Sequence, residues 1–313
     1  MSDAAVRAQG LVKRYGEIVA VDEVDLSVAR GDVFGFLGPN GAGKTTTLRM
    51  LLGLIRPTAG NAELFGRDPL RHGARALDGV AGFVEGPRFY PYLSGRKNLR
   101  LLADFDEPVS KSRIDEVLET VELRDRAKDR VGGYSHGMRQ RLGIAASLLR
   151  SPRLLLLDEP TTGLDPAGMR DMRDLVRRLA GEGITILLSS HLLNEVEELC
   201  NRVAIIRKGR IIYQGGLREL LGQAAAGYRL RTPELERART VCLTQRGIDE
   251  VRVDGDVLTF LADEDAVGAL SIALGQARIP VTALAPHGDS LEELFLQLTG
   301  GESSDHDRAA VAS

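Results

Sequence analysis

The chain has 313 residues, a length that favours two domains over one. Hydrophobic residues make up 43% and charged residues 27%, which is an ordinary globular composition. The net charge of −3 argues against a protein that coats nucleic acid, because such binding requires a basic face. The chain has two cysteines and no signal-peptide pattern, and we therefore expect a reducing cytosol as its compartment. No apolar run approaches the roughly 18 residues that span a bilayer, so any membrane role is expected to require a partner.

Short apolar runs alternate with amphipathic stretches from residue 1 to about 220. Runs that are apolar throughout are typical of parallel strands covered on both faces, and they occur at 33–38, 154–158, 184–190 and 203–209. In the stretch 169–179, methionine, valine and leucine recur at helical spacing. We therefore expect an α/β fold for this part of the chain.

The pattern changes after Leu221. Residues 222–227, rich in glycine and alanine, predict a linker, and strand, helix, strand, strand, helix and strand follow within 228–285. This β-α-β-β-α-β order predicts a small α+β domain of ferredoxin-like type. Ser290, with Glu293 three residues on, predicts a last helix opened by a capping box. The expected divisions are a first domain, a linker, an accessory domain and a disordered tail of low apolar content, at 1–221, 222–227, 228–300 and 301–313.

Residues 38–45 fit the phosphate-loop pattern G-x-x-x-x-G-K-[ST] in full, between an apolar strand and a helical pattern. In such a loop the glycines let backbone N–H groups wrap the phosphates, and the helix start adds its positive dipole end. Lys44 is expected to reach the β- and γ-phosphates, and the Thr45 hydroxyl to bind Mg²⁺. An ordinary glycine-rich turn is the alternative. The predicted nucleotide contacts are Gly38, Pro39, Asn40, Gly41, Ala42, Gly43, Lys44, Thr45 and Thr46.

Asp158 and Glu159 directly follow the apolar run at 154–157. Ligands of α/β sheets bind at the C-terminal ends of the strands, where these two carboxylates would lie. With a phosphate loop upstream, Asp158 is predicted to hold Mg²⁺ and Glu159 to polarise the attacking water. The two motifs together predict a site for a nucleotide such as ATP and for Mg²⁺, in either an ATPase or a P-loop kinase.

Residues 134–141, Tyr-Ser-His-Gly-Met-Arg-Gln-Arg, precede the two carboxylates. Read alone, Ser135 would cap a helix and Gly137 would let the backbone approach an anion. The segment also resembles the signature of ATP-binding cassette (ABC) proteins, whose commonest form is Leu-Ser-Gly-Gly-Gln. Ser135 and Gly137 match that form, whereas Tyr134, His136 and Met138 depart from it. The order of all the motifs over residues 5–220 is similar to that of the family.

This resemblance implies further roles. Asp165, in the Gly-Leu-Asp-Pro segment after Glu159, matches the family's dimer-contact loop, and His191 matches the histidine near the γ-phosphate. Tyr15 takes the place of the aromatic that stacks on adenine, although a half-buried strand tyrosine is the alternative. The family fold is a P-loop ATPase core with β-rich and helical subdomains. Each ATP in the family lies between two cassettes, so this chain would need a second copy of itself or a homologous cassette.

Glu85 stands where the family normally carries glutamine, a residue that touches both the Mg²⁺ shell and the groove where the membrane subunit docks. A glutamate here resembles the exporters of lantibiotics and bacitracin-like peptides, in a branch that also includes drug-resistance exporters. We therefore expect Glu85 to join Thr45 and Asp158 as a metal ligand. The loop 86–93, Gly-Pro-Arg-Phe-Tyr-Pro-Tyr-Leu, is too apolar for a simple solvent-facing linker, and we expect a protein surface to cover it.

The resemblance favours the ATPase subunit of an exporter for antibiotics or peptides, which would drive a separate transmembrane permease at the cytoplasmic face of the membrane. A non-transport family member acting on nucleic acid or ribosomes is the alternative, but the chain has neither a second cassette nor a long coiled-coil insertion. A P-loop kinase would leave the signature segment and His191 unexplained. No nucleic-acid partner is expected, and no residue of the chain identifies the cargo.

Overall fold

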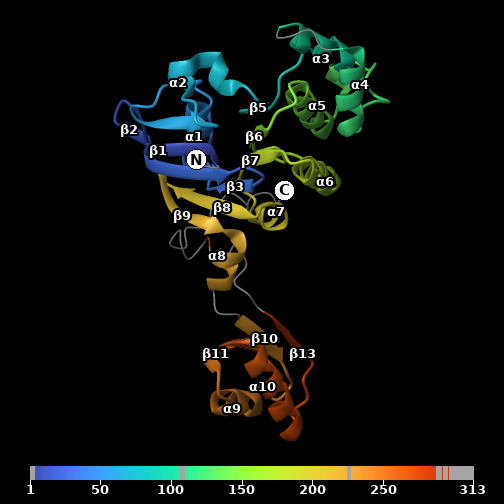
Figure 1. Cartoon of the computed structure of the whole chain (residues 1–313). Coiled ribbons are helices and arrows are strands. Elements are labelled where there is room, and N and C mark those ends of the chain that lie inside the picture. The colour runs from blue at the N-terminus through green and yellow to red at the C-terminus, as the bar shows by residue number, and fades with distance from the viewer. Residues whose placement is uncertain (1–3, 106–109, 224–226, 287–290, 292–294, 296–313) are drawn as a thin grey trace. The chain divides into compact units, whose positions relative to one another are not determined.

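The computed structural model describes residues 4–105, 110–223 and 227–286, together with Leu291 and Phe295 (Figure 1). The chain divides into two compact units, Met1–Gly215 and Gly216–Ser313, and each is described here by itself. Helix α8 (Leu217–Gln223) belongs to the second unit, so the division falls six residues before the boundary expected at Leu221. The predicted helix at Ser290 and the tail 301–313 lie outside the described residues.

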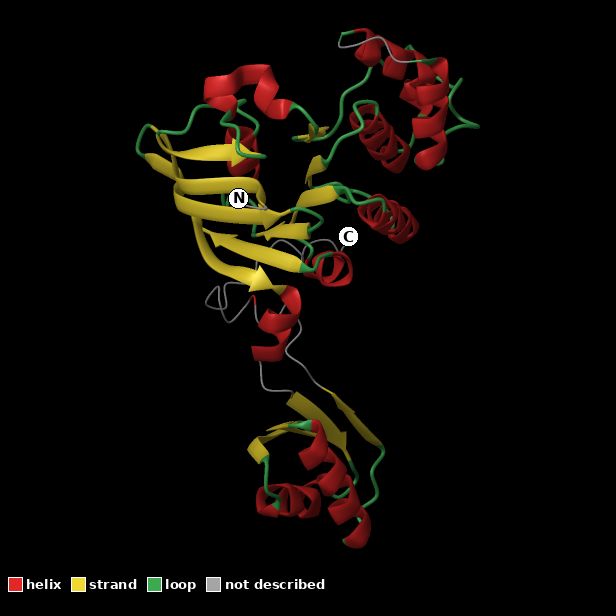
Figure 2. Cartoon of the chain, in the orientation of Figure 1, coloured by secondary structure: helices red, strands yellow, loops and turns green. Residues whose placement is uncertain are grey.

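The first unit contains an antiparallel sheet of three strands, in the order β2-β1-β4 (Figure 2). These strands are β1 (Ala4–Tyr15), β2 (Ile18–Ala29) and β4 (Ala59–Leu64). Along β2, Val24, Leu26 and Val28 are buried while the residues between them are exposed. This period of two is typical of a strand with one face on the core.

A second sheet of six strands has the order β5-β6-β7-β3-β8-β9. Its strands are β3 (Val33–Leu37), β5 (Val80–Phe83), β6 (Leu154–Asp158), β7 (Thr185–Ser190), β8 (Arg202–Arg207) and β9 (Arg210–Gly216). The four predicted apolar runs form β3, β6, β7 and β8, which are neighbours and pair in parallel. The α/β fold expected from the sequence is confirmed, and the C-terminal ends of β6, β7 and β3 meet at one edge.

Helices cover both faces of the six-stranded sheet. Helix α1 (Lys44–Leu51) packs against strands of both sheets, and its Leu48 and Leu51 are buried in one core with Phe34 and Phe36 of β3. On the other face α6 (Pro166–Gly181) and α7 (Leu193–Leu199) pack on β7. Two short helices connect β4 to β5: α2 (Pro69–His72) and the 3₁₀ helix η1 (Gly73–Leu77). The phosphate-loop helix is therefore fixed between two sheets.

Three further helices of the first unit pack on one another: α3 (Gly95–Asp104), α4 (Lys111–Thr120) and α5 (His136–Leu148). They form the green group in Figure 1, and a 3₁₀ turn, η2 (Val131–Gly133), leads into α5. Ser94, Ser110 and Ser135 each accept a backbone N–H bond at the start of one helix. These N-caps fix where each helix begins.

The second unit has a four-stranded antiparallel sheet in the order β11-β12-β10-β13. Its elements after α8 are β10 (Gly227–Arg231), α9 (Leu235–Thr244), β11 (Ile248–Asp254), β12 (Val257–Ala262), α10 (Glu264–Gln276) and β13 (Ala283–Pro286). This succession is the β-α-β-β-α-β order expected from the sequence. Leu230, Leu258 and Leu270 belong to a separate core, which makes this unit compact by itself.

Candidate functional site

The phosphate loop joins the C-terminal end of β3 to the start of α1. Gly43 precedes α1 with φ 108°, and a Cβ on Gly43 would lie 2.6 Å from the Ala20 carbonyl oxygen. A Cβ on Gly38 would lie 2.4 Å from the Ile206 carbonyl oxygen. Only glycine fits either position, so the chain needs both to hold this loop shape. No side chain caps α1, and its first N–H groups are available to a phosphate.

Lys44, the first residue of α1, directly follows the loop and is buried. Its Nζ donates to the carbonyl oxygens of Gly38, at 2.7 Å, and Pro39, at 3.2 Å. The same Nζ lies 3.3 Å from Oε1 of Glu159. Pro39, Asn40 and Gly41 are exposed, whereas Ala42 is buried and Thr46 half-buried. The lysine charge is therefore held at the mouth of a loop whose outer residues are open to a ligand.

Asp158 is the polar centre of the sheet edge. Its Oδ2 accepts from the Thr45 hydroxyl at 2.9 Å and from the Glu85 backbone N–H at 3.2 Å. Its Oδ1 accepts from the Ser189 hydroxyl at 2.6 Å, and Ser189 Oγ in turn accepts from the Glu159 N–H at 3.0 Å. Both Asp158 and Ser189 are buried. These contacts hold the ends of β6 and β7 and the start of α1 together.

The hydroxyl of Thr45 and the carboxylate of Asp158 suit Mg²⁺, which prefers hard oxygen ligands. Among the described residues, no group of three or more His, Cys, Asp or Glu side chains could hold a metal by itself. A magnesium ion here would therefore complete its shell with phosphate oxygens and water, as Mg²⁺ usually does in nucleotide sites. The two predicted ligands fit the ion.

Glu159 and His191 meet at the same edge. Oε2 of Glu159 accepts from the Thr162 hydroxyl at 2.9 Å and lies 3.1 Å from Nδ1 of His191. Burial raises the pKa of Glu159, but the Thr162 hydrogen bond and the charges of Lys44 and His191 outweigh it, so this pKa lies below its ordinary value. Glu159 is thus an ionised carboxylate beside the phosphate loop.

The Glu85 side chain points to a different partner from the one expected. Its carboxylate forms an ion pair with the guanidinium of Arg49 on α1, and only its backbone N–H contacts Asp158. The structure thus brings Thr45 and Asp158 together and turns the Glu85 carboxylate toward Arg49. The metal role of Glu85 stays a prediction.

The signature residues lie on another part of the unit. Ser135 caps α5 by accepting from the Met138 N–H at 3.2 Å, and a Cβ on Gly137 would lie 3.5 Å from Leu164. Asp165 caps α6 by accepting from the Gly168 N–H at 2.9 Å. No hydrogen bond between described residues joins this segment to the phosphate loop. Tyr15, at the end of β1, is 48% exposed, and the Nζ of Lys13 lies over one face of its ring, 5.0 Å from the centroid.

Several residues of the site escaped the sequence analysis. Ser189 bonds Asp158 because the two lie opposite one another in the β6–β7 register, and no pattern in the sequence indicates this contact. Glu195 of α7 is buried and accepts from Thr161 and, at 3.5 Å, from Ser190. Burial raises the pKa of Glu195 above its ordinary value, although the Thr161 hydrogen bond and Arg173 oppose the shift.

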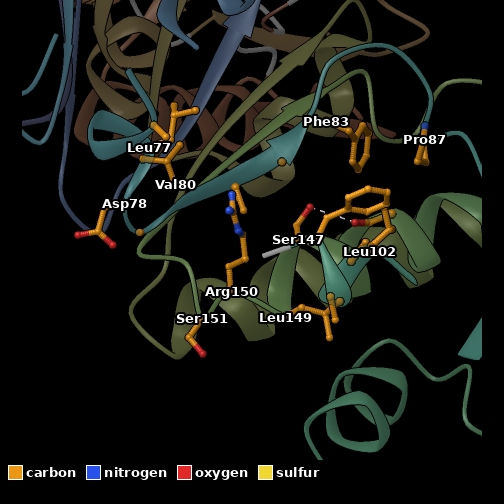
Figure 3. Close-up of a pocket in the computed structure, with 18 of the residues that line it drawn as sticks. Leu77, Asp78, Val80, Phe83, Pro87, Leu102, Ser147, Leu149, Arg150 and Ser151 are labelled. Carbon is orange, nitrogen blue, oxygen red and sulfur yellow. Dashed lines mark hydrogen bonds between the residues drawn. The ribbon is translucent and has the colours of Figure 1, made fainter. Parts of the chain in front are cut away.

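A cavity of about 960 Å³ opens beside β5, between the sheet edge and α5 (Figure 3). Its lining residues include Phe83, Pro87 and Phe89 from β5 and the loop after it, Leu102 of α3 and Ser147 of α5. Arg150 extends into the same space. The cavity therefore borders the loop that follows Glu85, part of which lines it.

The family pattern and the similar proteins all point to one family. The ABC transporter family pattern matches residues 21–162. The chain is 41% identical to the bacitracin transport ATP-binding protein BcrA of Bacillus licheniformis over 303 residues, 95% of this chain and 97% of that protein. It is 40% identical to the daunorubicin resistance ATP-binding protein DrrA3 of Streptomyces coeruleorubidus over 312 residues, 96% of this chain and 98% of that protein.

Solved structures agree with these relatives. An ATP-binding subunit of an ABC transporter superposes with a TM-score of 0.63 at 28% identity, covering 70% of this chain and 92% of that one. The predicted resemblance to the bacitracin and drug-resistance branch is confirmed by the relatives. In the part of the chain that the structure describes, no helix is long and apolar enough to cross a membrane. The motifs at the sheet edge and the nearly full-length relatives together show that this chain belongs to the ABC transporter ATP-binding proteins and is an ATPase of that family.

Proposed function

We propose that the chain is the ATPase subunit of an exporter that removes a peptide antibiotic or a drug from the cell. The observation that carries this proposal is the meeting of Lys44, Thr45, Asp158, Glu159 and His191 at one sheet edge. The cargo class is supported by relatives named for bacitracin transport and daunorubicin resistance. A glutamate at position 85, where the family normally has glutamine, supports the same branch.

The site residues divide the work of hydrolysis among them. The phosphate loop and Lys44 hold the β- and γ-phosphates by backbone N–H groups and one ammonium charge. Ionised Glu159 orients the attacking water and accepts its proton, while His191 fixes the Glu159 carboxylate from one side. Mg²⁺, held by Thr45 and Asp158 with Glu85 nearby, would neutralise charge that develops on the phosphate oxygens. Tyr15 offers its exposed ring to the adenine.

We infer that two copies of the chain, or one copy and a homologous cassette, enclose two ATP molecules. Within one chain, no hydrogen bond between described residues joins Ser135 or Gly137 to the phosphate loop. The start of α5, with its positive dipole end, nevertheless suits an anion. A second chain would bring its Ser135 and Asp165 to the nucleotide of the first. ATP between the two copies would then favour closure, and hydrolysis would favour opening.

The cavity beside β5 is the docking site that we propose for the separate permease, at the cytoplasmic face of the membrane. Its walls are apolar at Phe83, Pro87 and Phe89, and Tyr92 and Phe105 nearby are exposed. A cavity with apolar walls, charged residues such as Arg88 and Arg150 in its lining, and exposed aromatic side chains nearby is typical of a surface that binds another protein. This arrangement agrees with the expectation that the loop 86–93 is covered by a partner.

The test is resistance in a sensitive bacterium. The chain is expressed together with each candidate multispan membrane protein encoded in its own genome, and growth is measured against bacitracin, a lantibiotic and daunorubicin. We expect resistance to one of these classes, and its loss with Glu159→Gln. Absence of resistance to all of them would reject the export proposal, and ATPase activity stimulated by ribosomes or nucleic acid would favour the alternative function.

A further inference from the structure

The ion pair between Arg49 and Glu85 is not explained by nucleotide chemistry alone. The two residues are 36 positions apart in sequence, on α1 and on the loop after β5. Their side chains are 35% and 56% exposed. Exposed ion pairs contribute little to folding stability, so stabilising the fold does not account for a pair between Arg49 and Glu85.

Four residues form a closed ring of contacts around the pair. Thr45 and Arg49 lie at i and i+4 on α1, so their side chains share one face of the helix. Oδ2 of Asp158 accepts from the Thr45 hydroxyl and from the Glu85 N–H. The ion pair closes the ring from Glu85 back to α1. A shift of Asp158 or Thr45 during nucleotide binding must therefore reach Glu85.

The backbone at Glu85 stores strain. Its φ is 64°, in the left-handed region that is unfavourable for a residue with a Cβ. Such a conformation persists only where surrounding contacts enforce it. The contacts here are the Asp158 acceptor and the Arg49 guanidinium. Two residues later Pro87 lines the cavity, followed by Phe89.

We propose that Arg49 is a positioning residue that holds the Glu85 loop in the conformation described above. Glu85 lies beside Asp158 and Thr45, so its carboxylate would leave Arg49 when a cation held by those two residues offers it a second partner, and the strained backbone would then relax. The loop residues that line the cavity then change position. Arg49 in this way regulates the surface proposed for the permease, so the inference rests on that proposed function.

The test needs no partner protein. Because the chain has no tryptophan, Phe89→Trp places a single fluorescent reporter in the loop. Three variants are made in this background: Arg49→Gln removes the charge, Arg49→Lys keeps it, and Arg124→Gln breaks a similarly exposed pair with Glu119 in the helical group. Binding of Mg–ATP is measured by calorimetry in parallel with the tryptophan spectrum.

The reporter protein should show a spectral change on binding Mg–ATP. Arg49→Gln should reduce that change by about twofold or more, the range expected for residues that couple two sites, while binding and melting temperature stay close to those of the reporter. Arg49→Lys should retain most of the change, and Arg124→Gln all of it. A full spectral change in Arg49→Gln with Mg–ATP bound, or none in the reporter itself, would overturn the proposal. Failure of the reporter to bind Mg–ATP at all would instead reject the proposed function.

Discussion

Replacing Glu159 by glutamine tests the assignment of the base most directly. The substitution keeps the shape of the side chain and removes one negative charge. That charge now faces Lys44 Nζ at 3.3 Å and His191 Nδ1 at 3.1 Å. Glutamine can still accept the Thr162 hydrogen bond, so the local fold should persist.

The expected loss lies in the chemical step. A positioned general base contributes roughly 10²- to 10⁴-fold to a rate. At about 1.36 kcal/mol for each factor of ten, Glu159→Gln should raise the barrier by about 2.7 to 5.4 kcal/mol. ATP binding should not weaken, because the variant removes a negative charge from beside the phosphates. An ATP-bound dimer should therefore accumulate.

Stability adds a second, independent readout. Because the folded-state pKa of Glu159 lies below its unfolded value, the carboxylate stabilises the fold above the unfolded pKa, and this contribution is lost as the pH falls through the folded pKa. Glu159→Gln should thus reduce the free energy of unfolding at neutral pH, and the reduction should shrink in acid.

The assignment of Glu159 as the base is tested by three measurements: the ATPase rate, the nucleotide affinity by calorimetry, and the oligomeric state by size-exclusion chromatography with ATP. Glu119→Gln, which removes an exposed carboxylate from a surface ion pair, is the control and should behave like the wild type. Turnover of Glu159→Gln within tenfold of the wild-type rate would refute the base assignment. Loss of ATP binding would show that Glu159 serves binding instead.

Three further predictions concern other parts of the chain. Ser135→Ala and Ser110→Ala each remove one helix N-cap, and each should lower the free energy of unfolding by about 1 kcal/mol in thermal melts. Only Ser135→Ala should also weaken ATP-dependent dimerisation, measured by sedimentation. Equal effects of the two variants on dimerisation would reject the signature role of Ser135. Because burial raises the pKa of Glu195, its ionisation destabilises the fold increasingly as the pH rises from the ordinary glutamate pKa to the raised one, and fully above it. Calorimetric melting should therefore show Glu195→Gln gaining stability over the wild type at neutral pH relative to acid pH, and a difference that does not change with pH would contradict this. Burial raises the pKa of both thiols, that of Cys242 to about 11, so neither Cys200 nor Cys242 should react with a thiol reagent at pH 8 until the chain unfolds.

Features that depend on a few neighbouring residues could be derived from the sequence. The glycines and Lys44 of the phosphate loop, the carboxylates after the run at 154–157, and the cap at Ser135 are all local patterns with a local physical cause. The apolar runs predicted parallel strands because a strand covered on both faces has no polar side. The resemblance to a known family then supplied roles for Tyr15 and His191 that no local pattern reveals.

Contacts between distant segments were decided only by the tertiary structure. Ser189 meets Asp158 across 31 positions, and Thr161 meets Glu195 across 34, because β6 and β7 are neighbours in register. The Glu85 carboxylate could face either the metal site or α1, and sequence alone could not choose between them. The strained backbone at Glu85 and the position of Arg49 one helical turn after Thr45 turn it toward α1. A local sequence pattern fixes which groups are present, but the order of strands in the sheet determines which of them meet.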